Sequence, residues 1–308
     1  MDEARMPAGR MHIGEVETDV ALVRRLLAAQ FPHWAGLPIE PVHAGGTDNA
    51  LYRLGDDMAV RLPRIEGATG QVEQERVWLP RLAPHLPLAI PLPMATGAPG
   101  EGYPWQWSIQ RWLAGENATV SPLADPDQAA RELAGFIAAL RRITVTGWPP
   151  PGPPASFRDT PLAARDAAVH EAIAALGDAL DTEAAFAMWE VALNAPEWDA
   201  PRVWIHADLQ PLNLLVAGGR LSAVIDFGGL GLGDPAVDVM AAWTLFTAGA
   251  REVFRAALGV DDATWARGRG WALSFALIAL PYYERTNPTL AGVARRTIAE
   301  VFADRRQR

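Results

Sequence analysis

The chain has 308 residues, half of them apolar, with a net charge of −9 and an isoelectric point near 5.2. This length allows one large domain or two smaller ones, and the acidic balance argues against a nucleic-acid-binding protein, which would need a basic face. Cysteine is absent, which excludes disulfides, thiolate metal sites and cysteine nucleophiles.

Lysine is absent as well, and all 27 basic residues are arginine. A Schiff base, a lysine general base and a phosphate-binding lysine are therefore excluded. The sequence contains no apolar run of 18 residues, and its N-terminus lacks the apolar core of a signal peptide. We therefore expect a cytoplasmic protein without membrane association, in which residues 1–10 are disordered.

The first part of the chain predicts one helix and then an antiparallel sheet. Thr18 is a candidate cap for a helix that extends to about residue 31. Strands are expected at 39–43, 50–54 and 58–62. The loop between the first two strands contains Gly46 and Thr47, and such a loop can lay backbone N–H groups over a phosphate. An ordinary turn is the alternative for this loop.

A helix over residues 69–82 places Val72, Glu75 and Leu79 on one apolar face. An inward-facing glutamate needs a partner, and Arg61 on the preceding strand is a candidate. The alternative for Arg61 is a charge that faces solvent on an alternating strand.

Strands are also expected at 88–90 and 105–112, after which the composition changes. We therefore predict a first domain over residues 1–112, a hinge over 113–116 and a mostly helical second domain over 117–308. The helices expected in the second domain cover residues 127–143, 161–179, 182–195, 235–247, 251–258, 262–280 and 287–304.

Three polar residues stand out in the apolar segment 203–238. A hairpin about Gly218 and Gly219 places Asn213 roughly opposite Val224, so that Asn213 and Asp226 lie at the same open end. Asp208 lies just outside the preceding strand. A carboxylate and an amide oxygen with room for water and phosphate suit Mg²⁺.

Other chemistries fit this segment less well. A glycosidase would use two carboxylates, but no sugar-stacking aromatics surround them. A zinc hydrolase would need more histidines than His206, and a Ser-His-Asp triad would need a G-x-S-x-G elbow, which is absent. Phosphoryl transfer fits best, because it needs one carboxylate near the attacking hydroxyl and oxygen ligands for magnesium.

The segment HADLQPLN from His206 to Asn213 has the spacing H-x-D-x-x-x-x-N, and Asp226-Phe-Gly follows at hairpin distance. It resembles the catalytic segment of the protein-kinase-like superfamily. The fuller pattern, HADLQPLNLLV and then VIDFGGLGLGDPAVD, is similar to the aminoglycoside phosphotransferase family, with Ala207 where the family has glycine.

The resemblance implies an α+β, bilobal protein-kinase-like fold. A small N-terminal lobe, an antiparallel sheet with one key helix, would bind the nucleotide. A larger, mostly helical C-terminal lobe would carry the catalytic and substrate-binding residues.

The resemblance also implies roles for the polar residues. Asp208 would be the catalytic carboxylate, and Asn213 and Asp226 would be the Mg²⁺ ligands. Arg61 falls where the family has a strand lysine that binds the donor phosphates and pairs with a helix glutamate, here Glu75. His206 and Asp238 would brace the catalytic loop.

The donor would be ATP or GTP, with Gly46 and Thr47 lying over its phosphates. The hinge that contacts the base would be formed by Gln110, Trp112 and Leu113.

The acceptor is expected to be a small hydroxylated molecule, with an aminoglycoside-like or macrolide-like antibiotic favoured over choline or a sugar. Its wall is expected at Tyr282, Tyr283 and Glu284, where Pro281 should separate two helices. A nucleotide-binding scaffold without catalysis is a second hypothesis, which only Arg61 supports. The oligomeric state is left open.

Other candidates for the acceptor pocket, each with a structural alternative, are Trp243, Trp265, Trp271, Asp261 and Asp262.

Overall fold

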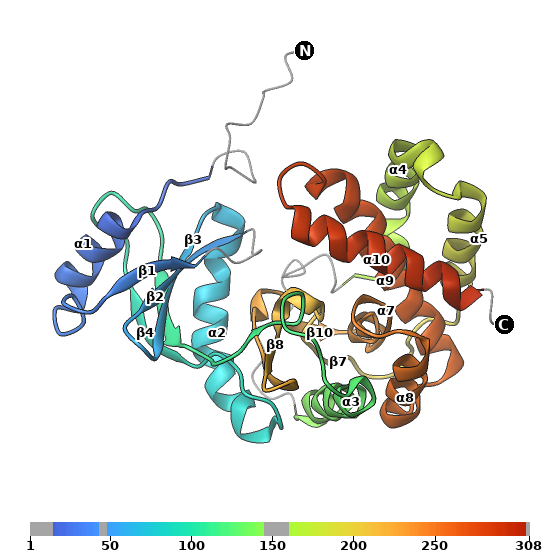
Figure 1. The fold of residues 1–308 in the computed structure, drawn as a ribbon, viewed down its shortest axis with the longest axis horizontal. Coiled ribbons are helices and arrows are strands. Elements are labelled where there is room, and N and C mark those ends of the chain that lie inside the picture. Colours follow the sequence, from blue (N-terminus) through green and yellow to red (C-terminus); the bar gives the residue numbers. More distant parts are fainter. Residues whose placement is uncertain (1–14, 43–47, 145–159, 306–308) are drawn as a thin grey trace, which may run out of the picture. The chain divides into compact units, whose positions relative to one another are not determined.

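The computed structural model describes residues 15–42, 48–144 and 160–305 (Figure 1). The chain divides into two compact units, the first formed by Met1–Pro84 and Ala89–Ala114, and the second by His85–Leu88 and Gly115–Arg308. Two expectations lie outside the described residues: disorder in residues 1–10 and the loop containing Gly46 and Thr47.

The first unit is built on a five-stranded sheet in which each neighbouring pair of strands is antiparallel. The strand order is β1-β2-β3-β5-β4. The strands are β1 Ile39–Val42, β2 Asn49–Leu54, β3 Met58–Pro63, β4 Pro93–Gly97 and β5 Trp107–Arg111.

Two helices cover the two faces of this sheet. Helix α1 (Val20–Gln30) packs its buried leucines against one face, together with Tyr52 and Trp107. Helix α2 (Thr69–Leu82) lies on the other face, toward which the polar side chains of the central strands point. The sheet is therefore apolar on one side and carries a polar cluster on the other.

Two sequence-based expectations for this unit are wrong in detail. Asp19, not Thr18, caps α1, because its carboxylate accepts from the Leu22 N–H at 2.6 Å, while Tyr52 bonds the Thr18 hydroxyl. Residues 88–90 do not form the expected strand, and the strand in this region is β4 at Pro93–Gly97. The proline that begins β4 cannot donate to the sheet, and a bulge follows it in the pairing with β5.

The second unit contains a three-stranded sheet, β6-β8-β9, and a two-stranded sheet, β10-β7. The strands are β6 Glu116–Asn117, β7 Val203–Ile205, β8 Leu214–Ala217, β9 Arg220–Val224 and β10 Gly231–Gly233, with a short 3-10 turn at Pro211–Asn213. The helices are α3 Pro126–Arg142, α4 Asp166–Leu176, α5 Thr182–Leu193, α6 Ala236–Val239, α7 Ala241–Thr244, α8 Ala248–Leu258, α9 Asp262–Tyr283 and α10 Pro288–Arg305.

Helices in the second unit depart from expectation at three places. The helix expected over 161–179 is the shorter α4, with 3-10 helices before and after it at Leu162–Arg165 and Gly177–Ala179. The predicted helix over 235–247 is two short helices, α6 and α7. Pro281 does not separate two helices but lies in the last turn of α9, which continues to Tyr283. No helix among the described residues is long and apolar enough to cross a membrane.

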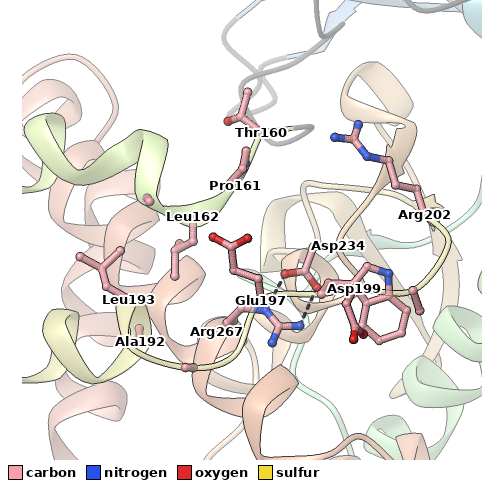
Figure 2. Close-up of a pocket in the computed structure, with 14 residues that line it drawn as sticks. Thr160, Pro161, Leu162, Ala192, Leu193, Glu197, Asp199, Arg202, Asp234 and Arg267 are labelled. Carbon is pink, nitrogen blue, oxygen red and sulfur yellow. Dashed lines mark hydrogen bonds and ion pairs between the residues drawn. The ribbon is translucent and has the colours of Figure 1, made fainter.

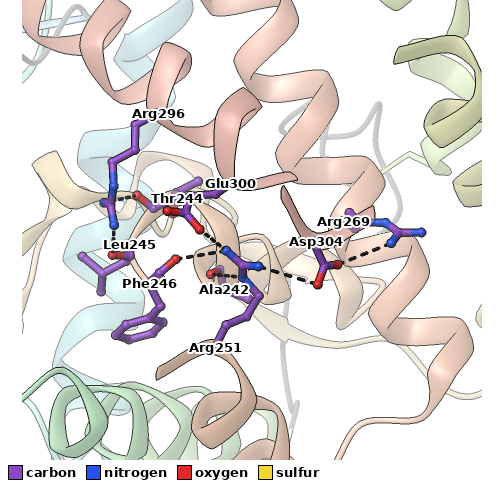
Figure 3. Close-up of polar contacts among 9 residues, drawn as sticks. All are labelled: Ala242, Thr244, Leu245, Phe246, Arg251, Arg269, Arg296, Glu300 and Asp304. Atoms are coloured by element: carbon purple, nitrogen blue, oxygen red, sulfur yellow. Dashed lines mark hydrogen bonds and ion pairs between the residues drawn. The ribbon is translucent and has the colours of Figure 1, made fainter. Parts of the chain in front are cut away.

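A buried arginine joins the last helices of this unit (Figure 3). Arg251 of α8 is only 1% exposed. Its guanidinium donates to the carbonyls of Ala242 and Phe246 and pairs with Glu300 and Asp304 of α10. The predicted α+β fold, an antiparallel sheet unit with a key helix and a larger helical unit, is confirmed.

Candidate active site

The loop between β7 and β8 and the turn after β9 bring three predicted site residues together in the second unit. In the hairpin, Leu214 lies opposite Val224, and the register shifts between Leu215 and Val216. The predicted pairing of Asn213 with Val224 is therefore wrong by one residue. The Asn213 carbonyl instead accepts from the Ile225 N–H at 2.9 Å, which holds the start of one strand against the end of the other.

Asn213 fixes Asp208 by two hydrogen bonds. Its Nδ2 donates to the Asp208 carbonyl at 2.9 Å and to Oδ2 of the Asp208 carboxylate at 2.7 Å. Asn213 is buried, whereas Asp208 is half-buried. Because the amide nitrogen is directed at Asp208, Oδ1 is the amide atom left to face a cation.

Asp226 has a left-handed backbone, with φ 60° and ψ 74°. A left-handed conformation costs about 1 kcal/mol for most residues, but aspartate tolerates it better than most. Its carboxylate is half-buried, and Oδ1 accepts from the Gly228 N–H at 3.4 Å.

The described part of the chain holds no cluster of three or more histidine or acidic side chains that could bind a metal. One carboxylate and one amide oxygen nevertheless fit Mg²⁺, which keeps several waters and takes further oxygens from phosphates.

Asp238 of α6 fastens the loop that carries Asp208. Its fully buried carboxylate accepts from the N–H of His206 at 2.9 Å and from that of Ala207 at 2.8 Å. These bonds confirm the bracing role predicted for Asp238. Ala207 itself has a φ of 69°, which explains why glycine suits this position. Room for its methyl group comes from Gly229, where an added Cβ would lie 3.2 Å from the Cβ of Ala207.

His206 is fully buried and bonded on both ring nitrogens. Nε2 lies 3.1 Å from the Ile225 carbonyl, to which it donates, and Nδ1 accepts from the Asp208 N–H at 3.2 Å. Burial lowers the pKa of His206 below its usual value, although the carboxylates of Asp238, Asp208 and Asp226 oppose the shift. A neutral, doubly bonded imidazole braces the loop, as predicted.

In the first unit, the predicted pairing of Arg61 with Glu75 is confirmed. Arg61 is 7% exposed and Glu75 is 1% exposed, and the Arg61 guanidinium donates to Oε1 of Glu75. The other carboxylate oxygen accepts from Nε2 of Gln110 at 2.7 Å. The alternative of a solvent-facing arginine is therefore wrong.

Two of the residues predicted to contact the nucleotide base, Gln110 and Trp112, make contacts within the first unit. The side chain of Gln110 is directed at Glu75. The N–H of Arg111 donates to Leu92 at 2.8 Å, and that of Trp112 donates to Asp57 at 2.7 Å. The Trp112 ring contacts the Arg53 guanidinium, 5.0 Å from its centroid. The side chain of Gln110 and the N–H of Trp112 are therefore engaged within the first unit.

The predicted acceptor wall lies at the end of α9. Tyr282 is 53% exposed, its ring centroid is 4.7 Å from that of Tyr283, and Glu284 pairs with Arg295 at 2.7 Å.

The other acceptor candidates have structural roles. Trp243, Trp265 and Trp271 are buried in the core. Asp261 caps α9 by accepting from the Thr264 N–H, and Asp262 pairs with Arg255. Burial leaves little of the three tryptophan rings exposed to an acceptor.

Sequence reasoning missed two side chains around Arg61. Oε1 of Gln71 accepts from Nη2 of Arg61 at 3.0 Å, and the Asn49 amide lies against both. Gln71 precedes Glu75 by four residues, so the helical period that identified Glu75 could also have identified Gln71.

A cavity of about 220 Å³ lies elsewhere in the second unit (Figure 2). In this view the ion pair of Arg267 and Asp234 lies at the centre, with Leu162 and Leu193 on one side and Arg202 on the other. The sequence did not predict this cavity. Arg267 and Asp234 neutralise each other, so the cavity offers no unpaired charge at this pair.

A family model described as the phosphotransferase enzyme family matches residues 39–271. Among solved structures, the chain is similar to the GDP complex of wild-type aminoglycoside 2'-phosphotransferase-IIIa. The TM-score is 0.70 and the identity 19%, over 94% of this chain and 100% of the other.

The apoenzyme of macrolide 2'-phosphotransferase MphH from Brachybacterium faecium is also similar, with a TM-score of 0.58 and 20% identity over 91% of this chain and 97% of the other. ADP-bound aminoglycoside phosphotransferase APH(2'')-Ib has a TM-score of 0.57 and 17% identity, over 92% and 99% of the two chains. At these identities the structures establish a shared fold, and no curated protein matches the sequence. Because the family model covers most of the chain, the protein belongs to the phosphotransferase enzyme family.

Proposed function

We propose that this protein is a small-molecule O-phosphotransferase that moves the γ-phosphate of ATP or GTP to a hydroxyl of an antibiotic-type acceptor, aminoglycoside-like or macrolide-like. The observation that carries the proposal is the carboxylate of Asp208, which the Asn213 amide holds within a loop fastened by Asp238. Membership of the phosphotransferase enzyme family supports the reaction type.

Asp208 is the catalytic carboxylate in this proposal. It orients the acceptor hydroxyl and takes its proton late in the transfer. The acceptor oxygen forms a bond to the γ-phosphorus, and the bond from that phosphorus to the nucleoside diphosphate oxygen breaks. The hydrogen bond from Nδ2 of Asn213 to Oδ2 of Asp208 limits rotation of the carboxylate, so that little reorganisation is needed when the acceptor binds.

Asn213 and Asp226 are the residues that would hold Mg²⁺. A bound magnesium ion would neutralise charge on the donor phosphates. Asn213 offers Oδ1, because its nitrogen is engaged with Asp208. Asp226 offers a carboxylate whose direction is set by a left-handed backbone and by the Gly228 N–H.

The donor nucleotide is assigned to the first unit. Arg61, paired with Glu75, would bind the phosphates, with Gly46 and Thr47 over them and Leu113 at the base. Arginine suits this task because it stays charged and its planar fork matches phosphate oxygens. Similar structures in GDP and ADP complexes support a purine nucleotide donor.

The class of acceptor is inferred from the similar solved structures. The residues that would contact the acceptor are inferred from the sequence. One similar structure is a complex with GDP and kanamycin, and another is a macrolide phosphotransferase. Tyr282, Tyr283 and Glu284 are proposed as the acceptor wall, in which the half-exposed Tyr282 ring offers an apolar surface.

The test is a panel of aminoglycosides, macrolides, choline and sugars, incubated with Mg²⁺ and either ATP or GTP while phosphate transfer is measured. Transfer to an antibiotic-type hydroxyl is expected. Asp208→Asn should lower the rate by about 10²- to 10⁴-fold and leave nucleotide binding nearly intact.

Two outcomes would contradict the proposal. Wild-type turnover in Asp208→Asn would exclude the assigned mechanism. Nucleotide binding without transfer to any compound in the panel would favour a nucleotide-binding scaffold without catalysis.

A further inference from the structure

Arg61 is surrounded by several hydrogen-bond acceptors, which a guanidinium needs in greater number than a lysine ammonium does. A lysine ammonium is a compact charge, whereas a guanidinium presents five N–H donors in one plane. We propose that Gln71 and Asn49 are positioning residues that fix the plane of the Arg61 guanidinium and so set the orientation in which it binds the donor phosphates. This inference rests on the proposed nucleotide-binding role of Arg61.

The contacts hold the guanidinium at more than one edge. Nη1 donates to Oε1 of Glu75, and Nη2 donates to Oε1 of Gln71 at 3.0 Å. With its amide oxygen turned toward Arg61, Asn49 accepts from Nη2 at 2.9 Å and from Nε at 3.3 Å. In the opposite orientation its nitrogen donates to Oε1 of Gln71 at 3.2 Å. Either way, Asn49 restrains the Arg61–Gln71 pair.

Glu75 alone could not hold a guanidinium in this site. Its Oε1 takes one hydrogen bond from Arg61, and its Oε2 takes the hydrogen bond from Gln110 at 2.7 Å. The Nη2 edge therefore needs acceptors from elsewhere, because buried donors without partners are costly. Gln71 supplies one from the preceding turn of α2, and Asn49 supplies another from the start of β2 when its amide oxygen faces Arg61.

The charge of these partners is as informative as their geometry. Gln71 and Asn49 are neutral, whereas Glu75 pairs with Arg61 through a carboxylate. An acid in place of either amide would repel a phosphate. Neutral amide oxygens can orient the guanidinium without that repulsion.

A double-mutant cycle tests the proposal. The binding of Mg²⁺ complexes of non-hydrolysable ATP and GTP analogues is measured by titration calorimetry for wild type, Gln71→Leu, Arg61→Lys and the double variant. Gln71→Leu is expected to weaken binding about tenfold, as for a hydrogen bond to a charged group. In the Arg61→Lys background, which has no Nη2, the same change should alter binding less than about twofold. Equal effects in both backgrounds would overturn the proposal.

Controls separate positioning from loss of structure. Gln30→Leu removes a glutamine of the same unit that bonds Ala98 at 2.7 and 2.9 Å, and it should leave nucleotide binding unchanged. Gln71→Glu keeps an acceptor for Nη2 but adds charge, so it should keep the wild-type melting temperature and still weaken binding of the triphosphates.

If Arg61→Lys does not fold, Gln71→Leu is compared on triphosphates and on adenosine or guanosine. The loss should appear only when phosphates are present, and equal losses would refute the positioning role. If wild type binds no nucleotide, the proposed function fails together with this inference. If wild type binds nucleotide and the cycle is additive, only this inference fails.

Discussion

The guanidinium of Arg267 donates to both carboxylate oxygens of Asp234, from Nε at 2.7 Å and from Nη2 at 3.0 Å. Asp234 also accepts from the N–H of Ala236, the first residue of α6. That helix carries Asp238, whose carboxylate fastens the loop before Asp208. Arg267 of α9 is thus joined to the brace of the candidate catalytic loop through one short helix.

Arg267→Met is expected to lower the free energy of unfolding by about 2–4 kcal/mol. The substitution leaves the largely buried Asp234 carboxylate without its cation, and it removes the bond to the Pro196 carbonyl. Urea unfolding followed by tryptophan fluorescence measures the change. Arg295→Met is the control, because Arg295 and its partner Glu284 are both more than half exposed and the change should cost less than about 1 kcal/mol. Equal losses of unfolding free energy in the two variants would show that burial does not make the Arg267–Asp234 pair more important for stability than an exposed ion pair.

His206 makes stability depend on pH. Because burial lowers its folded-state pKa, the unfolded state binds a proton at a higher pH than the folded state does. Its contribution to stability is therefore fully present above about pH 6.5, the usual pKa of histidine, and is lost as the pH falls below that value. The expected slope is at most about 1.4 kcal/mol per pH unit between the unfolded and folded pKa values.

The measurement is urea unfolding at pH 7.5, 6.5 and 5.5 for wild type and His206→Gln. Glutamine can still donate to the Ile225 carbonyl but does not titrate. The decline attributable to His206 should disappear in the variant. A decline of the same size in both proteins would assign it to other groups.

Local patterns were sufficient to predict much of the candidate site. Asp208, Asn213 and Asp226 lie within one short segment, where spacing and a hairpin turn place them together. Glu75 was predicted to face inward by helical period, and its partner Arg61 lies on an adjacent element. These contacts join elements that are close together in the chain, so the spacing of residues along the sequence is enough to predict them.

Details set by tertiary contacts could not be predicted in the same way. The bulge in the β8–β9 hairpin shifted the register by one residue, which a count along the strands does not reveal. Thr18 and Asp19 are both favoured N-cap residues, so the local pattern did not decide which of them caps α1. The pair of Arg267 and Asp234 joins residues 33 positions apart, and no local pattern connects them.

Asp226→Asn is expected to reduce the dependence of nucleotide binding on Mg²⁺. Asparagine tolerates the left-handed backbone at φ 60° better than alanine does, so the substitution removes charge with little added strain. Nucleotide affinity is measured by calorimetry across a Mg²⁺ titration. Wild type should bind more tightly as Mg²⁺ rises, and the variant should respond by about tenfold less. An unchanged Mg²⁺ response would remove Asp226 from the proposed ligands.

The buried network around Arg251 allows a prediction about stability that does not depend on the proposed function (Figure 3). Arg251→Met should lower the free energy of unfolding by about 3–5 kcal/mol, because two acids of α10 lose a buried partner. Arg255→Met is the matched control from the same helix. Its partner Asp262 is 95% exposed, so the loss should stay below about 1 kcal/mol.

Second substitutions then show which carboxylate suffers from the loss. Asp304 keeps a contact with Arg269 at 3.4 Å, whereas the ion pair of Glu300 observed in the described part of the chain is the one with Arg251. Glu300→Gln should therefore recover more stability in the Arg251→Met background than Asp304→Asn does. Urea unfolding of the two double variants decides the order. If Asp304→Asn recovers as much, the charge left by Arg251 is shared by both acids, and the contact with Arg269 does not compensate Asp304.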